Sequence, residues 1–130
     1  MNKAHATLRK FNISDEYYFA EGCFITELSN SPADPGLSIA RARLEPGRTT
    51  RWHSLVGTSE RYVIIEGTGE VELDESGPTE VSAGDVVIFP PGVPQRISNP
   101  GEVDLVFLAV CTPRFEQAAY IDLEDRQAPG

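Results

Sequence analysis

Residues 47–67 read GRTTRWHSLVGTSERYVIIEG, and the placing of one histidine and one glutamate between two glycines decides the predicted fold. The stretch is rich in Val, Ile, Tyr and Thr, which are common in β-strands. Successive side chains of a strand point to opposite faces, so we expect His53 and Leu55 to share one face. Glu60 follows after a short bend and begins a second strand.

The direction of Glu60 fixes that of its neighbours on this second strand. If Glu60 points into the protein, Tyr62 and Ile64 do so as well, because strand side chains alternate between two faces. An antiparallel neighbour then places the side chains of His53 and Glu60 close together. The stretch therefore predicts an interior site that contains an imidazole and a carboxylate.

A second stretch, residues 84–99, reads GDVVIFPPGVPQRISN and supplies a third candidate group. Gln95 begins a strand after a turn rich in proline and glycine. Imidazole, carboxylate and amide oxygen suit a divalent ion such as Mn, Fe, Ni or Zn. We therefore predict that His53, Glu60 and Gln95 are metal ligands. The alternative is a metal-free pocket in which they hydrogen-bond one another or a ligand.

These two stretches resemble the two signature motifs of the cupin superfamily and cover a little over a quarter of the chain. The family motifs read G-x5-H-x-H-x(3,4)-E-x6-G and G-x5-P-x-G-x2-H-x3-N. The resemblance implies an all-β double-stranded β-helix, the jelly-roll or cupin barrel, with roughly six to eight strands, usually as a dimer. The matching residues are Gly47, His53, Glu60, Gly67, Gly84, Pro90, Gly92 and Asn99.

The chain departs from the family motifs at two of the four usual ligand positions. Leu55 replaces the second histidine and Gln95 replaces the third. Leucine cannot bind a metal, whereas glutamine can do so through its carbonyl oxygen. Local stretches such as CTPRF at residues 111–115 resemble small bacterial cupins described as mannose-6-phosphate isomerase-like. That description rests on fold analogy and does not establish sugar chemistry.

Two further residues are candidates for catalysis. Arg51 has the same strand parity as His53, so we expect it to reach the barrel mouth and hold an anionic substrate group. Tyr62 would donate a hydrogen bond or a proton to a ligand. The alternatives are that Arg51 pairs with a surface carboxylate and that Tyr62 is a core residue with a satisfied hydroxyl.

The chain is expected to form one barrel with a segment on each side. Ten prolines and eleven glycines separate short apolar runs, a pattern typical of a β-sandwich or barrel. We divide the chain into N-terminal leader and edge strands (1–36), the barrel core (37–112) and a C-terminal tail (113–130) that packs on the barrel or on a dimer partner. Gly67, Thr68 and Gly69 predict the turn of a β-hairpin, and residues 114–120 predict one or two helical turns.

Charge and hydropathy exclude several classes of partner. The formal net charge is −9, whereas nucleic-acid-binding domains usually have a basic surface. The longest apolar run, residues 105–111, is far shorter than the roughly 20 residues of a membrane span. Residues 1–10 contain no apolar signal-peptide core, so we expect a cytoplasmic protein in which Cys23 and Cys111 are reduced thiols.

Two functions follow as expectations. The first is a metal-dependent enzyme, such as an isomerase, dioxygenase or lyase, that acts on a small anionic organic molecule. The second is a metal-free, non-catalytic module that binds or senses a small molecule. In both, we expect a homodimer.

Overall fold

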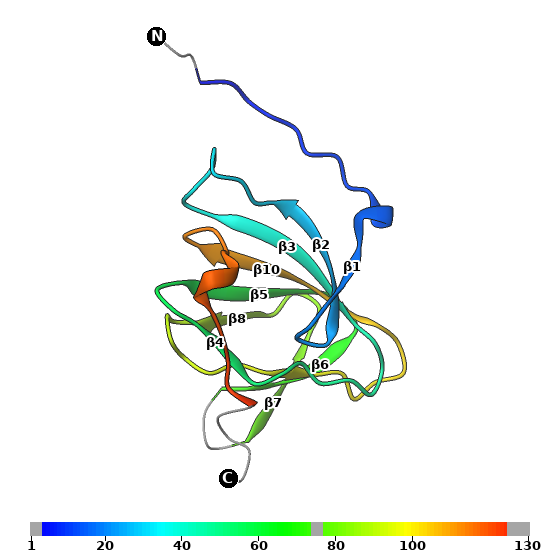
Figure 1. The fold of residues 1–130 in the computed structure, drawn as a ribbon. Helices are drawn as coiled ribbons and strands as arrows, with labels where there is room; N and C mark the ends of the chain where they lie inside the picture. Colours follow the sequence, from blue (N-terminus) through cyan, green and yellow to red (C-terminus); the bar gives the residue numbers. More distant parts are fainter. Residues whose placement is uncertain (1–3, 74–76, 125–130) are drawn as a thin grey trace.

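The computed structural model describes residues 4–73 and 77–124, which form eleven strands and two short 3-10 helices (Figure 1). The elements are η1 (Ile13–Asp15), β1 (Tyr17–Phe19), β2 (Cys23–Ser29), β3 (Ser38–Leu44), β4 (His53–Leu55), β5 (Ser59–Glu66), β6 (Thr68–Glu72), β7 (Pro78–Ser82), β8 (Val86–Phe89), β9 (Ile97–Ser98), β10 (Leu105–Thr112), η2 (Gln117–Ala119) and β11 (Tyr120–Asp122).

The strands form two layers around one core. One layer is an antiparallel six-stranded sheet in the order β1-β2-β3-β10-β5-β8. The other contains a three-stranded sheet, β7-β6-β9, and the pair β11-β4. Isolated bridges between His53 and Gln95, and between Thr49 and Ser98, join these two pieces. The structure confirms the predicted all-β jelly-roll barrel.

Side-chain alternation on β5 directs the site into this core. Glu60, Tyr62 and Ile64 are buried, as predicted, while the residues between them are more exposed. Tyr62 and Ile64 belong to the main apolar cluster, which also contains Phe107 of β10 and Val71 of β6. Residues from both layers therefore pack together, and the carboxyl group of Glu60 extends the same inner face.

The predicted hairpin at residues 67–69 is wrong. β5 pairs with β10 and β8, whereas β6 pairs with β7 and β9. A single residue, Gly67, separates the two strands and adopts a positive φ of 81°. One residue is too short for a two-residue hairpin loop, so the chain instead crosses from one layer to the other.

Strands near both ends of the described chain join the barrel. β1 and β2 extend the six-stranded sheet beyond β3, and the turn between them contains Gly22. The segment before η1 runs away from the barrel (Figure 1). At the other end, η2 provides the predicted helical turn, and β11 then pairs with β4 of the same chain. No helix among the described residues has the length and apolar character needed to cross a bilayer.

Candidate functional site

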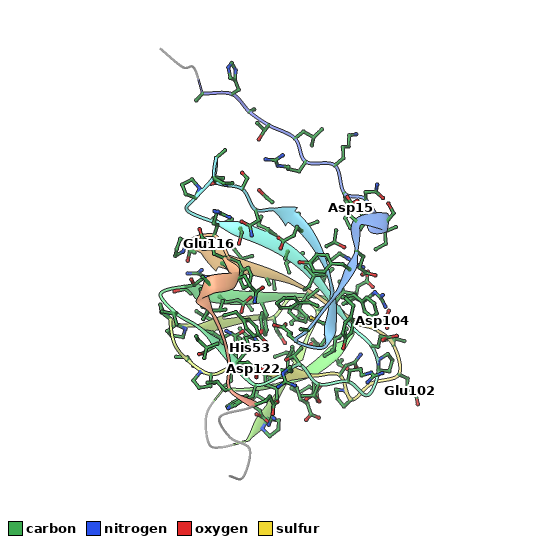
Figure 2. The ribbon with its side chains drawn as sticks, in the orientation of Figure 1. Asp15, His53, Glu102, Asp104, Glu116 and Asp122 are labelled. Carbon is green, nitrogen blue, oxygen red and sulfur yellow. The ribbon has the colours of Figure 1, made fainter. Side chains whose placement is uncertain are left out.

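His53 lies at the start of β4, between Gln95, with which it forms an isolated β-bridge, and strand β11. Its backbone N–H donates to Gln95 O over 3.2 Å, and Gln95 N–H donates to His53 O over 2.7 Å. On the other side, His53 pairs with Asp122, and Figure 2 shows the two residues side by side. The ring of Tyr120 stacks on the imidazole with centroids 5.0 Å apart. These contacts leave His53 only 2% exposed.

The imidazole is held in one tautomer. Its Nδ1 lies 2.6 Å from the carbonyl oxygen of Arg51, which can only accept a hydrogen bond. Nδ1 therefore carries the hydrogen, and Nε2 keeps a lone pair in the neutral ring. Burial lowers the pKa of His53, with Arg51 O and Glu60 opposing this effect, which favours the neutral form.

Glu60 is the buried carboxylate that the sequence predicted. It is 8% exposed, and its Oε2 accepts a hydrogen bond from the Cys111 thiol over 3.6 Å. Its Oε1 is buried without a hydrogen-bond partner among the described residues. Burial, together with the charge of Glu21, raises the pKa of Glu60 to about 7. An uncompensated carboxylate oxygen of this kind is costly unless a proton or a cation reaches it.

Gln95 and Tyr62 form a direct pair. The Tyr62 hydroxyl donates a short hydrogen bond to Gln95 Oε1. Both side chains are fully buried, and burial raises the pKa of Tyr62 well above its usual value. The contact satisfies the Tyr62 hydroxyl, which agrees with the alternative in which Tyr62 is a core residue. It orients the amide of Gln95, and a catalytic role for Tyr62 stays a prediction.

Glu21 is a site residue that the sequence analysis missed. It lies in the turn between β1 and β2, where its backbone carbonyl accepts a hydrogen bond from Arg51 N over 2.7 Å. This contact brings the carboxyl group into the site, with Oε2 3.4 Å from His53 Nε2. Burial raises its pKa to about 7. Glu21 lies outside both motif stretches, so only the fold reveals its place.

Both cysteines are free, buried thiols beside these carboxyl groups. Cys23 donates to Glu21 Oε1 over 3.4 Å, as Cys111 does to Glu60. Burial and the neighbouring carboxylates raise the pKa of both thiols. They therefore stay protonated and act as hydrogen-bond donors, because a nucleophilic cysteine needs a lowered pKa.

Arg51 does not point into the barrel as its strand parity suggested. Its Nε donates to Asp122 Oδ2 over 2.9 Å, and the side chain is partly exposed. It lines a surface depression together with Arg96, Glu72 and Glu124. The expected orientation is wrong because β11 places a carboxylate beside Arg51 at the surface. A catalytic role for Arg51 stays a prediction.

A cavity of about 80 Å³ adjoins the site. Its lining includes the buried Glu60 and Tyr62, the partly buried Glu21, and the exposed Glu27 and Tyr17. The described residues that line it include no lysine, arginine or histidine. The cavity is therefore acidic, and a free anion would find no cationic side chain in its wall.

Two buried donor atoms are available to a cation. His53 Nε2 offers a lone pair, and Glu60 Oε1 has no hydrogen-bond partner among the described residues. Within residues 4–73 and 77–124, no three His, Cys, Asp or Glu side chains are grouped as a complete metal site. His53 and Glu60 would therefore need the carbonyl oxygen of Gln95 as a third ligand, as the sequence predicted.

Comparison with known proteins agrees with the fold and the motifs. Residues 40–111 match the cupin domain family model. An uncharacterized protein of Methanocaldococcus jannaschii is 34% identical over 101 residues, covering 76% of this chain and 80% of that protein. The oxalate-binding protein of Thermotoga maritima is 39% identical over 72 residues, covering 55% of this chain and 59% of that protein.

A solved structure supports the fold alone. It is an uncharacterized conserved protein from Klebsiella pneumoniae with a double-stranded β-helix domain, and it matches with a TM-score of 0.73 at 18% identity. The alignment covers 89% of this chain and 97% of that one. The family match extends over more than half of the sequence and includes both motif stretches. The chain therefore belongs to the cupin family.

Proposed function

We propose that the protein binds a divalent cation through His53, Glu60 and Gln95, and a small organic molecule in the adjoining cavity. The observation that carries the proposal is Glu60 Oε1, buried without a partner in the same site as an imidazole whose Nε2 has a lone pair. Mn, Fe, Ni and Zn are the candidates, because they accept mixed nitrogen and oxygen ligands.

The cation would also hold the anionic group of the ligand. Arg51 pairs with Asp122, and the cavity wall has no basic side chain among its described residues. The Thermotoga relative is named as an oxalate-binding protein, which supports a carboxylate ligand here. A bound cation would polarise an oxygen of that ligand, which is the chemistry that metal-dependent isomerases, dioxygenases and lyases use. The resemblance to cupins described as mannose-6-phosphate isomerase-like does not enter the proposal, which names no sugar substrate.

Metal titration tests the proposal. Protein stripped with a chelator is titrated with Mn, Fe, Ni and Zn by calorimetry, with melting temperature as a second readout. We expect His53→Ala and Glu60→Gln to weaken binding by about 100-fold or more, since loss of a supporting contact alone costs about 10- to 100-fold. Glu27→Gln, at the cavity entrance, is the matched control and keeps its affinity. Failure of the unmodified protein to bind any of the four ions contradicts the proposal.

A metal-free binding module is the second candidate. It is favoured by the Tyr62 hydroxyl, which occupies the oxygen of Gln95, and by Glu21, which lies against His53 Nε2. In this case, protons shared among Glu21, His53 and Glu60 would replace the cation. Ligand binding that is unchanged by a chelator would favour this candidate over the first.

We also propose that the protein forms a homodimer through the outer face of the six-stranded sheet. β8 is the edge strand of that sheet, and Val86 and Ile88 on it are exposed. Ile65 of β5 is exposed on the neighbouring strand. A second copy would cover this edge and its apolar side chains.

A further inference from the structure

The cavity beside the site exists because small side chains meet on the inner face of the six-stranded sheet. Ala40 of β3 lies directly opposite Ala109 of β10, and Ala42 follows on β3. On its other side, Ala109 lies opposite Tyr62. All four residues line the cavity. Larger side chains at 40 and 109 would fill this space, so these alanines create it.

The cavity wall between its two ends is mainly apolar. Ile25, Phe107 and Phe19 line it together with the alanines. Glu60 marks the buried end, beside the proposed cation, and Glu27 marks the end at the surface. A molecule in the cavity therefore meets a polar group at each end and carbon in between.

We infer that the ligand is a monocarboxylate with an aliphatic chain of about three carbons, whose chain lies against Ala40 and Ala109. The inference rests on the proposed function, because the cation beside Glu60 binds the carboxylate. It goes further by excluding dicarboxylates whose second carboxylate would lie along the apolar wall, such as succinate.

Charge sets the first limit on the ligand. A second carboxylate would lie either against the alanines or near Glu27, and no basic residue of the described lining compensates it. Burying an unpaired charge against an apolar wall is strongly unfavourable. The cavity therefore selects a ligand with one anionic end.

Volume sets the second limit. The cavity measures about 80 Å³, whereas an apolar cavity of about 150 Å³ accepts benzene. An aliphatic chain of about three carbons fits in the smaller space. Each methylene buried there strengthens binding by about fourfold, the equivalent of about 0.8 kcal/mol.

Three carboxylates separate chain length from charge. Calorimetry on the Mn-loaded protein compares acetate, butyrate and succinate. We expect butyrate to bind about 15-fold more tightly than acetate, because two more methylenes are buried. Succinate has the four carbons of butyrate and a second charge, and we expect it to bind at least about tenfold more weakly than butyrate. Equal affinities for acetate and butyrate, or tighter binding of succinate, overturn the inference.

Variants on two strands test where the aliphatic chain of the ligand binds. Ala109→Val and Ala40→Val fill the cavity with a side chain that strands tolerate, and each should abolish the preference for butyrate while acetate binds as before. Ala109→Ser adds little volume and is the control that keeps the preference. Glu27→Gln should narrow the gap between butyrate and succinate. A butyrate preference that survives in both valine variants places the chain elsewhere and overturns the inference.

Uncharged probes separate this inference from the proposed function. Acetamide and butyramide need no cation, so their comparison is made in the presence of a chelator. Metal binding without any chain-length preference refutes the inference and leaves the proposed function standing. Suppose instead that the protein binds no metal, and that it prefers butyramide to acetamide but loses this preference in Ala109→Val. This result refutes the proposed function and supports the cavity as the place where the aliphatic chain binds.

Discussion

Burial controls the chemistry of the individual side chains in this site. Glu21 and Glu60 both have a pKa raised to about 7, and in both cases the largest cause is loss of solvent. His53 has its pKa lowered for the same reason. The three groups therefore resist charging, and a proton or a cation among them relieves that resistance. The cation proposed above would gain from this relief, although the site has only one imidazole.

The raised pKa of Glu21 makes the stability of the metal-free protein depend on pH. The folded state keeps its proton up to about pH 7, whereas the unfolded chain loses it near pH 4.5. This contribution to stability is therefore complete below pH 4.5 and is lost as the pH rises through 7. We expect Glu21→Gln to raise the free energy of unfolding at pH 8 by roughly 1–3 kcal/mol.

Urea denaturation with a chelator present, at pH 4 and pH 8, checks this expectation. At pH 4, Glu21 is protonated and Glu21→Gln should change little. Glu80→Gln, an exposed residue on β7, is the control and should be neutral at both values. An equal gain from Glu21→Gln at the two pH values would show that titration is not the cause.

Asn99 has a structural role although it belongs to the second motif. Its Nδ2 donates to Leu44 O and Val103 O, and its Oδ1 accepts from Gly101 N, all within 3.0 Å. Asn99→Ala leaves these backbone groups unpaired, and we expect a loss of about 3 kcal/mol in urea denaturation. Metal affinity should stay unchanged in the folded variant. A lowered metal affinity in Asn99→Ala, with an unchanged free energy of unfolding, would instead place Asn99 in the site.

Strand connections depend on a few backbone positions, of which Gly67 is the most constrained. A Cβ at Gly67 would lie 2.6 Å from Asp104 O, in addition to the strain of a positive φ. Gly84 also has a positive φ, but a Cβ there meets nothing within 4 Å. We expect Gly84→Ala to cost roughly 1 kcal/mol and Gly67→Ala roughly 3 kcal/mol or more. Thermal or urea unfolding measures both, and equal costs would contradict the role of Gly67.

Local patterns in the sequence predicted the strands that alternate clearly, and long-range contacts determined the rest. The inward set Glu60, Tyr62 and Ile64 follows from strand parity alone. β7 begins at Pro78 and is mostly polar, so it does not resemble a strand locally. β11 is three residues long and forms only by pairing with β4.

The site, like the strands, was predictable only where it depends on local sequence patterns. Motif spacing placed His53, Glu60 and Gln95 together, because His53 and Glu60 lie on strands of the barrel and Gln95 forms a bridge with His53. Glu21 depends on a backbone contact with Arg51, which is distant in sequence. Arg51 was misplaced because its partner Asp122 lies on the unpredicted strand β11. The missed Glu21 and the misplaced Arg51 therefore have the same cause. Each involves a residue outside the two motif stretches, one before them and one after them.

The protein as a whole has an apolar outer surface on the edge of its larger sheet, and a dimer would cover it. Ile88 on β8 is 63% exposed, and Ile88→Lys places a charge in the proposed interface. We expect the dimer to become a monomer, as measured by light scattering coupled to size-exclusion chromatography. Val103→Lys, at an equally exposed apolar position (65%) in the loop before β10, is the control. A dimer that persists in Ile88→Lys would contradict this interface.

β10 occupies the middle of the six-stranded sheet, between β3 and β5, although it is the second-last strand in the sequence. During synthesis, β3 and β5 leave the ribosome first, each with an unpaired edge. They can join only after residue 112 has emerged, and sheets that depend on such distant pairing fold in about milliseconds to seconds. The nascent chain therefore passes through a period of exposed strand edges, when aggregation and chaperone binding compete with folding. Insertion of β10 ends that period.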